Sequence, residues 1–273
     1  MAFRDDKLTY LEANGIPPLP GGGVAGTVEN DGARLWYAAF GEDLPAVILL
    51  HGGMGNAGNW AYQVPAIIAA GYAAIVVDSR GHGRSTRDDR PYSYRQMASD
   101  VRAVMDHLRL PRAVIVGWSD GADTGLILAD ETPERVAGVF FFACNMDATG
   151  TKPFEFTPVV GRILKQHKAD YAALSATPDD FNAFSEAVGL MQRTQPEYTA
   201  ADLARIHVPV AVVLGENDEF IKPEHVAYLA RTLPDATLNI IPDVSHFAPL
   251  QRPATFNAVM LDFVDRVFRR EPS

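Results

Sequence analysis

The sequence predicts an α/β fold in which a mostly parallel sheet of about eight strands is covered by helices on both faces. Short apolar runs alternate along the chain with longer segments of helical periodicity, as in successive right-handed βαβ crossovers. The run at residues 46–50, Ala-Val-Ile-Leu-Leu, is apolar at every position, as expected of a strand buried on both faces. A serine in Gly117–Gly121 lies between a strand-like run and a helical one, which is typical of a tight strand-to-helix turn.

The predicted sheet begins with an antiparallel pair. Residues 24–29 and 33–40 are joined by Asn30-Asp31-Gly32, and Asp-Gly readily adopts the positive φ of a hairpin turn. From residue 46 onward, strands and helices alternate. We expect strands at 46–50, 73–77, 113–117, 136–143, 208–214 and 236–241, and helices near 60–70, 94–108, 121–130, 223–232 and 254–269.

Two segments fall outside this alternation. Residues 1–23 contain a proline- and glycine-rich stretch that breaks both helix and strand, so we expect an N-terminal surface arm. Residues 145–207 carry helical pieces but no convincing strand, and we expect a helical lid subdomain inserted after the sixth strand. The core domain then comprises residues 24–144 and 208–273. Six lid aromatics could line an apolar acyl pocket or form the lid's own small core: Phe154, Phe156, Tyr171, Phe181, Phe184 and Tyr198.

The composition of the chain indicates which kinds of partner it binds and where in the cell it is expected. The 273-residue chain has 34 acidic and 24 basic residues and no strongly basic stretch, so we expect a small-molecule substrate and no nucleic acid. The charged N-terminus is not followed by an apolar run, which disfavours export and membrane insertion. The single cysteine, Cys144, allows no internal disulfide. These features favour a cytoplasmic protein, and nothing in the sequence indicates its oligomeric state.

Ser119 is the candidate nucleophile. A neutral serine needs a base to take its proton and a third group to orient that base. Asp218 and His246 directly follow the last two predicted strands, so all three side chains lie at one edge of a parallel sheet. The chain order Ser, Asp, His is the one expected on this architecture. We predict that His246 is the base and Asp218 the orienting acid, with Asp147 as the alternative acid.

The developing oxyanion needs two N–H donors. The backbone N–H of Asp120, the residue after the nucleophile, is one candidate. The Gly53 amide is the other, because His51-Gly52-Gly53-Met54-Gly55 follows a strand that ends at the same sheet edge. The presence of an acidic side chain at position 120 is explained by its place at a helix N-terminus, where the helix dipole stabilises a carboxylate by about 0.3–1 kcal/mol.

A dinucleotide-binding interpretation competes with this one. Residues 53–58 satisfy G-x-G-x-x-G after a strand, and Asp78 ends the next strand, where a ribose-binding acid would stand. That interpretation leaves Ser119, Asp218 and His246 without a role. We therefore expect no cofactor and a structural Asp78, whose carboxylate accepts backbone N–H groups of the 80–85 turn. No HExxH or paired Cys/His spacing occurs, so no metal site is expected either.

These residues resemble the α/β-hydrolase superfamily, specifically its small lidded serine hydrolases. The matching landmarks are His51-Gly52-Gly53, Asp78-Ser79-Arg80-Gly81-His82-Gly83-Arg84-Ser85, Gly117–Gly121, Thr132-Pro133-Glu134-Arg135-Val136, Asp218 and Ser245-His246-Phe247. Gly-Trp-Ser-Asp-Gly resembles the elbow of the valacyclovir-hydrolase-like branch, although Ala122 stands where that branch often has glycine. The lid and the C-terminal motifs resemble enol-lactonase-like and cofactor-free haloperoxidase-like members.

The resemblance implies an α/β-hydrolase fold and cleavage of a small carboxylic ester or lactone through an acyl-enzyme on Ser119. For the Asp120 side chain it implies contact with a substrate amino group. One alternative is perhydrolysis or cofactor-free halogenation by the same triad. Another, from a different class, is a non-catalytic ligand-binding protein that keeps a hydrolase scaffold.

Overall fold

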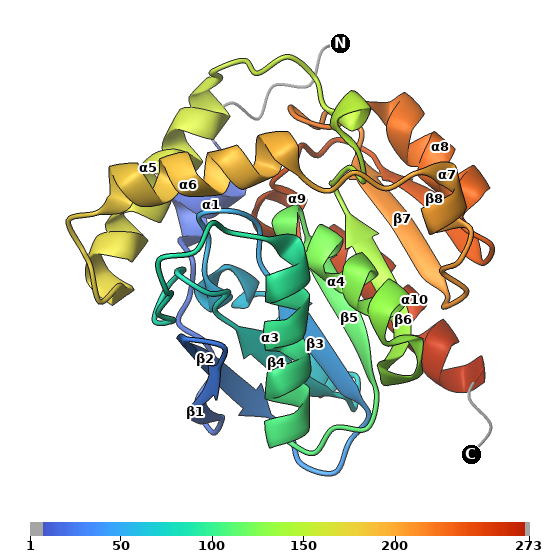
Figure 1. Ribbon diagram of the computed structural model, residues 1–273, viewed down its shortest axis with the longest axis horizontal. Coiled ribbons are helices and arrows are strands. Elements are labelled where there is room, and N and C mark those ends of the chain that lie inside the picture. Colours follow the sequence, from blue (N-terminus) through green and yellow to red (C-terminus); the bar gives the residue numbers. More distant parts are fainter. Residues whose placement is uncertain (1–7, 271–273) are drawn as a thin grey trace.

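The computed structural model of the protein describes residues 8–270. Eight strands form one sheet with helices on both of its faces (Figure 1). Residues 1–7 of the predicted arm and residues 271–273 of the predicted core lie outside the described residues.

The sheet has the predicted number of strands and is mostly parallel. Its strands are β1 (Val24–Asn30), β2 (Ala33–Phe40), β3 (Ala46–Leu50), β4 (Ala73–Val77), β5 (Ala113–Trp118), β6 (Val136–Phe142), β7 (Val210–Gly215) and β8 (Ala236–Ile241). Their order is β1-β2-β4-β3-β5-β6-β7-β8, in which only the β1–β2 and β2–β4 pairs are antiparallel. Asp31 and Gly32 have φ values of 44° and 80°, so the predicted hairpin turn is confirmed.

The helices of the core follow the predicted alternation closely. They are α2 (Val64–Ala69), α3 (Tyr94–His107), α4 (Asp120–Glu131), α8 (Pro223–Thr232), α9 (Ala248–Gln251) and α10 (Pro253–Arg270), with 3-10 turns at Ala57–Trp60 and Pro133–Arg135. The helix predicted at 60–70 begins later, at Val64. Pro65 explains the late start, because proline lacks the N–H that a helix interior needs and fits only in the first turn.

Strand β6 shows how both faces of the sheet are buried. Phe140 and Phe142 pack against Phe256 of α10, with ring centroids 5.6 and 5.1 Å apart. Val139 points to the opposite face, where it approaches Gly125 of α4. Figure 1 accordingly shows α3 and α4 in front of the sheet and α10 behind it. This two-sided packing makes the sheet a rigid base for the loops at its carboxyl edge.

One described residue of the predicted N-terminal arm, Leu8, is buried. Leu8 is 0% exposed, and α1 (Thr9–Asn14) packs against α9. Glu12 forms an ion pair with Arg162 of α5 (Pro158–Leu174). Residues 9–23 are exposed or half-buried, as expected of a surface arm. Leu8 departs from that expectation, because an isolated leucine in an aperiodic stretch gives no signal of burial.

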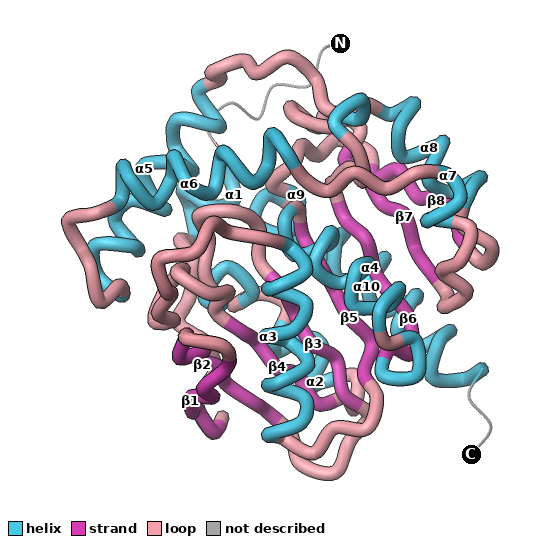
Figure 2. Tube along the Cα trace, in the orientation of Figure 1, coloured by secondary structure: helices cyan, strands magenta, loops and turns pink. Residues whose placement is uncertain are grey.

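The chain between β6 and β7 leaves the strand–helix alternation. It contains a 3-10 turn at Ala148–Gly150, then α5, α6 (Phe181–Thr194) and α7 (Ala200–Leu203), and we call residues 145–207 the inserted segment. Figure 2 shows it as helices and loops, with α5 and α6 lying across the end of the sheet at which α4 begins.

Four of the six aromatics of the inserted segment are buried. Tyr171, Phe181 and Phe184 pack together at centroid distances of 4.6 to 6.1 Å, with Tyr171 stacked on Phe184. The Tyr198 hydroxyl donates to Asp130. Phe154 and Phe156 are exposed. The interpretation of these side chains as a small core therefore fits the four buried residues and does not fit Phe154 and Phe156.

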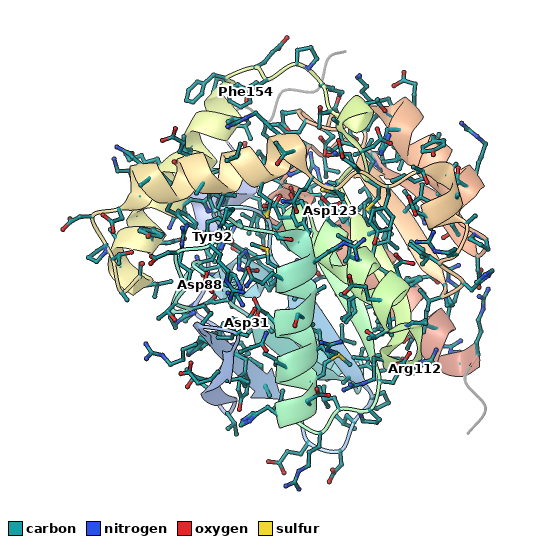
Figure 3. All side chains as sticks on the ribbon, in the orientation of Figure 1. Asp31, Asp88, Tyr92, Arg112, Asp123 and Phe154 are labelled. Atoms are coloured by element: carbon teal, nitrogen blue, oxygen red, sulfur yellow. The ribbon has the colours of Figure 1, made fainter. Side chains whose placement is uncertain are left out.

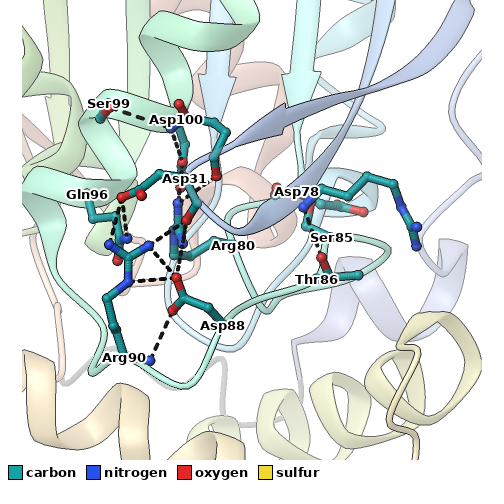
Figure 4. A network of polar contacts seen from close by, with 12 residues as sticks. Asp31, Asp78, Arg80, Ser85, Thr86, Asp88, Arg90, Gln96, Ser99 and Asp100 are labelled. Carbon is teal, nitrogen blue, oxygen red and sulfur yellow. Dashed lines mark hydrogen bonds and ion pairs between the residues drawn. The ribbon is translucent and has the colours of Figure 1, made fainter.

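A buried arginine links the loop after β4 to α3 and to the end of β1. Arg80 is 1% exposed, and its Nε and Nη2 atoms each donate to an Asp100 carboxylate oxygen of α3 at 2.7 Å. Its guanidinium also approaches the Asn30 carbonyl at the end of β1. Figure 4 shows this network extending outward through Asp88 and Arg90 to Asp31. The β1–β2 hairpin, the loop after β4 and α3 are thereby held together.

Removing the Asp100 carboxylate leaves the Arg80 guanidinium buried without its bidentate partner. We expect Asp100→Ala to lower the free energy of unfolding by about 3–5 kcal/mol, the usual cost of breaking a buried ion pair from one side. Urea denaturation followed by circular dichroism measures this change. The matched control is Asp262→Ala, which breaks an exposed pair with Arg266 and should cost about 0.5 kcal/mol. Equal losses in the two variants would contradict the prediction.

Candidate active site

Ser119 occupies a strained turn between β5 and α4. Its φ and ψ are 54° and −125°, a conformation that non-glycine residues rarely adopt. A Cβ atom at Gly117 would lie 2.4 Å from Ala122 Cα, and one at Gly121 would lie 2.1 Å from the Leu50 carbonyl oxygen. The strand and the helix therefore cross too closely for any side chain at these two positions, as the sequence predicted.

The structure brings Asp218 and His246 together. The Nδ1 atom of His246 lies 2.9 Å from Asp218 Oδ2, and the two residues are 5% and 2% exposed. Because a carboxylate only accepts, Nδ1 carries the proton and Nε2 is left as the basic nitrogen. The other Asp218 oxygen accepts the backbone N–H groups of Phe220 and Ile221, each at 2.8 Å. Both oxygens of the Asp218 carboxylate are thus hydrogen bonded.

Carboxylates around His246 change its basicity. Burial acts to lower the pKa of His246, but the charges of Asp218, Glu219 and Asp120 outweigh burial and raise this pKa above its ordinary value. Glu219 Oε2 also accepts the backbone N–H of His246 at 2.9 Å. Burial raises the pKa of Glu219 itself. No sequence pattern marks Glu219 as part of the site, although it directly follows Asp218.

The predicted oxyanion loop lies against the serine turn. A Cβ atom at Gly52 would lie 3.2 Å from Ser119 Cβ, and one at Gly53 would lie 2.6 Å from Asp120 Oδ2. His51 supports the loop: its Nε2 accepts the Ser79 N–H, so its Nδ1 donates to the Gly52 carbonyl at 2.7 Å. Gly53 and the N-terminus of α4 are therefore neighbours, as two donors to one oxygen must be.

Asp78 has the structural role predicted for it. Its carboxylate accepts the Arg84 N–H at 2.8 Å inside the 80–85 turn and the Ala57 N–H at 2.7 Å beyond the oxyanion loop. Arg84 also forms an ion pair with it at 2.7 Å. The residue thus joins two loops at the carboxyl edge of the sheet.

The Asp120 side chain connects the serine turn to the inserted segment. Its carboxylate accepts from the Tyr94 hydroxyl at 3.0 Å and from Gln192 Nε2 of α6 at 3.0 and 3.1 Å. Burial raises the pKa of Asp120, while these two donors act to lower it. No sequence pattern marks Tyr94 or Gln192 as part of the site, because their contacts depend on how α3 and α6 are placed in space.

A second carboxyl group lies one turn into α4. Asp123 (Figure 3) is buried, and its Oδ1 atom has no hydrogen-bond partner among the described residues. Burial, together with the neighbouring Asp120, raises the pKa of Asp123 well above its usual range. Burial likewise raises the pKa of the Cys144 thiol, which favours the unreactive protonated form. Burial thus raises the pKa of both carboxyl groups at the start of α4, and of the two only Asp120 has hydrogen-bond donors from α3 and α6.

Two residues before α5 also bear on the site. Asp147, the alternative acid, accepts the Thr149 N–H at 2.8 Å and lies 3.9 Å from His225, whereas the hydrogen bond to His246 comes from Asp218. Lys152 Nζ donates to the Asp218 backbone carbonyl at 2.6 Å. The inserted segment therefore contacts the loop that carries the acid.

Residues 8–270 offer neither a metal site nor a membrane-spanning helix. Nowhere in this range do three or more His, Cys, Asp or Glu side chains gather so that they could hold a metal ion. No helix in the same range is both long and apolar enough to cross a bilayer.

Comparison with known proteins identifies the family. Residues 45–167 match the family model described as the alpha/beta hydrolase fold. A Variovorax paradoxus protein named "Putative carbamate hydrolase RutD" is 30% identical over 258 residues, which cover 85% of this chain and 97% of that protein. The chain belongs to the α/β-hydrolase fold family. The predicted fold and the resemblance on which it partly rested are thus confirmed.

Other members of this α/β-hydrolase family are similar over nearly their whole length. The 3-oxoadipate enol-lactonase 2 of Acinetobacter baylyi is 29% identical over 252 residues, covering 85% of this chain and 93% of that protein. A solved structure described as Est816, an N-acyl homoserine lactone degrading enzyme, is 29% identical with a TM-score of 0.67 and coverage of 87% and 100%. The enol-lactonase from Burkholderia xenovorans LB400, at 23% identity and a TM-score of 0.70, shares the fold, with coverage of 89% and 100%.

The charges around His246 lead to a pH prediction. If activity needs neutral His246, kcat/KM rises with pH, with a midpoint above the ordinary histidine pKa of about 6.5. Glu219→Gln removes one charge that raises this pKa, so the rise should move to lower pH and the plateau near pH 8 should change little. Hydrolysis of p-nitrophenyl acetate, followed at an isosbestic wavelength between pH 5 and 9, measures the profile.

Glu216→Gln is the matched control for this experiment. Glu216 lies on the same loop, but its carboxylate accepts the exposed Asp243 N–H and not that of His246. This variant should keep the wild-type profile. An identical profile in wild type and Glu219→Gln would argue against the electrostatic role of Glu219.

Proposed function

We propose that the protein is a serine hydrolase that cleaves a carboxylic ester or lactone of a small molecule through an acyl-enzyme on Ser119. The observation that carries this proposal is the buried hydrogen bond between Asp218 and His246, at the same sheet edge as the strained turn of Ser119. The relatives named as an enol-lactonase and as an N-acyl homoserine lactone degrading enzyme support ester or lactone bonds as targets.

In the proposed mechanism, Asp218 holds the Nδ1–H of His246, so that Nε2 can take the Ser119 proton. Ser119 Oγ attacks the substrate carbonyl, and the backbone N–H groups of Gly53 and Asp120 stabilise the oxyanion. As the intermediate collapses, the proton on His246 passes to the leaving oxygen. Water, deprotonated by His246, then attacks the acyl-enzyme and releases the acid with Ser119 restored.

We also propose that the inserted segment acts as the lid of this site. The support is the hydrogen bond from Gln192 of α6 to the Asp120 carboxylate, beside the proposed nucleophile. This contact places α6 next to the serine turn, the position from which a lid excludes water from a site.

Ser119→Ala tests the nucleophile. We expect kcat for p-nitrophenyl acetate to fall by about 10⁴-fold to 10⁶-fold, because the triad acts as a unit, while the melting temperature stays near that of wild type. A fluorophosphonate probe should label the wild-type protein and not the variant. Ser185→Ala, which removes a hydroxyl that donates within α6, is the control and should be labelled normally. Absence of labelling in the wild type would instead favour a ligand-binding protein on this scaffold.

For the Asp120 carboxylate we propose a preference for substrates with an amino group on the acyl side. A group at the Gly53 Cβ position would lie 2.6 Å from Asp120 Oδ2, so an acyl chain bound at the oxyanion loop passes close to this charge. An incoming ammonium group would share the carboxylate with Gln192 or replace it there.

Asp120→Asn tests this preference with little change in shape. We expect the ratio of kcat/KM for an amino-acyl ester to that for the matching acyl ester to fall by about tenfold to a hundredfold, the effect of one charge-assisted hydrogen bond. Using the ratio at pH 8 cancels any change in His246 basicity. If the ratio does not change, Asp120 serves the helix N-terminus and the lid contact alone.

A further inference from the structure

Phe154 and Phe156 stand apart from the other aromatics of the inserted segment. Each is 68% exposed, on the loop that leads from the 3-10 turn at Ala148–Gly150 into α5. Figure 3 shows Phe154 on this loop. Exposed phenylalanines carry a cost in water, so two of them on one short loop call for an explanation.

Of these two residues, only Phe154 contacts a ring that in turn contacts His246. Its ring stacks on Phe220, with centroids 6.3 Å apart and planes 14° apart. Phe220 in turn meets the His246 imidazole edge to face, at 4.7 Å and 86°. Phe156 lies instead over Gly161 of α5, where a Cβ atom would be 2.9 Å from its ring carbons. The rings of His246, Phe220 and Phe154 are therefore successive neighbours, and the last of them is exposed to solvent.

Hydrogen bonds hold the start of this loop against the loop that carries Asp218. The Lys152 N–H donates to the Phe220 carbonyl at 2.7 Å, and Lys152 Nζ donates to the Asp218 carbonyl at 2.6 Å. An antiparallel bridge pairs Thr151 with Ile221. The chain is thus fixed against the acid loop two residues before Phe154.

The direction of acyl transfer says which part of a substrate meets this surface. The carbonyl oxygen is directed to the Gly53 and Asp120 N–H groups, whereas the leaving oxygen must face His246 to receive its proton. The alcohol part of an ester therefore extends along the imidazole side. The Trp118 and Phe247 rings beside His246 are buried, whereas the Phe220 ring leads to the exposed ring of Phe154. The acyl part extends from the other side of the carbonyl, near the oxyanion loop.

We propose that Phe154 and Phe220 form a binding site for the leaving group of the substrate, and that this group is an apolar alcohol of aromatic or medium-chain aliphatic type. The inference rests on the serine-hydrolase function proposed above and adds to it the chemical class of the alcohol. Stacking and apolar contact are the means of recognition, since the rings present no hydrogen-bonding group.

Two ester series test this assignment. In the first, the alcohol varies (ethyl, hexyl and benzyl acetate); in the second, the acid varies (ethyl acetate, ethyl hexanoate and ethyl phenylacetate). We expect Phe154→Ala to lower kcat/KM for hexyl and benzyl acetate by about threefold to tenfold relative to ethyl acetate, the size of one aromatic contact. The second series should keep its wild-type ratios, and Phe154→Trp should restore the preference in the first.

Phe156→Ala is the matched control, because Phe156 is the same residue type with the same exposure two positions away. It should behave as wild type in both series. Equal effects of Phe154→Ala and Phe156→Ala, or a loss confined to the acid series, would overturn the leaving-group assignment while leaving the hydrolase function intact. A wild-type protein that hydrolyses none of these esters and is not labelled at Ser119 would overturn both proposals.

Discussion

The arrangement of this protein depends on the close crossing of α4 over the ends of β3 and β5. The crossing is possible because Gly117 and Gly121 carry no side chain where the backbone of Ala122 and the Leu50 carbonyl approach. It forces positive φ on Ser119 and presents the start of α4 to the loop after β3. The fully buried strands on either side supply the rigidity that keeps this strained turn in place.

Negative charge is concentrated around one imidazole. Asp218 and Glu219, from the loop after β7, and Asp120, at the start of α4, all favour the protonated form of His246. In the proposed mechanism, an imidazolium formed at His246 is therefore stabilised, and the neutral base is available over a narrower pH range. Asp123 does not add to this charge, because its burial favours the neutral acid.

The features that the sequence predicts well are those with a local physical cause. Apolar β-branched runs become buried strands, Asp31-Gly32 turns the first hairpin, and the residues that follow β7 and β8 meet because parallel strands end at one edge. Features that depend on the placement of distant segments were missed. Gln192 and Lys152 are ordinary polar residues until α6 and the loop before α5 are set against the core, and the burial of Leu8 likewise depends on α9.

The ends of the inserted segment are held to the core by backbone hydrogen bonds, whereas α6 in its middle contacts the core through the Gln192 side chain. Thr151 and Lys152 are hydrogen bonded to the loop around Phe220, and the Tyr198 N–H donates to the Met146 carbonyl at 2.8 Å. Residues 153–197 lie between these two attachment points and contain α5 and α6. This part of the chain is suited to exchange as a module between related chains. A chimera joined within residues 153–197 would keep the geometry of the acid loop, whereas one joined at residue 145 would discard the backbone contacts that support it.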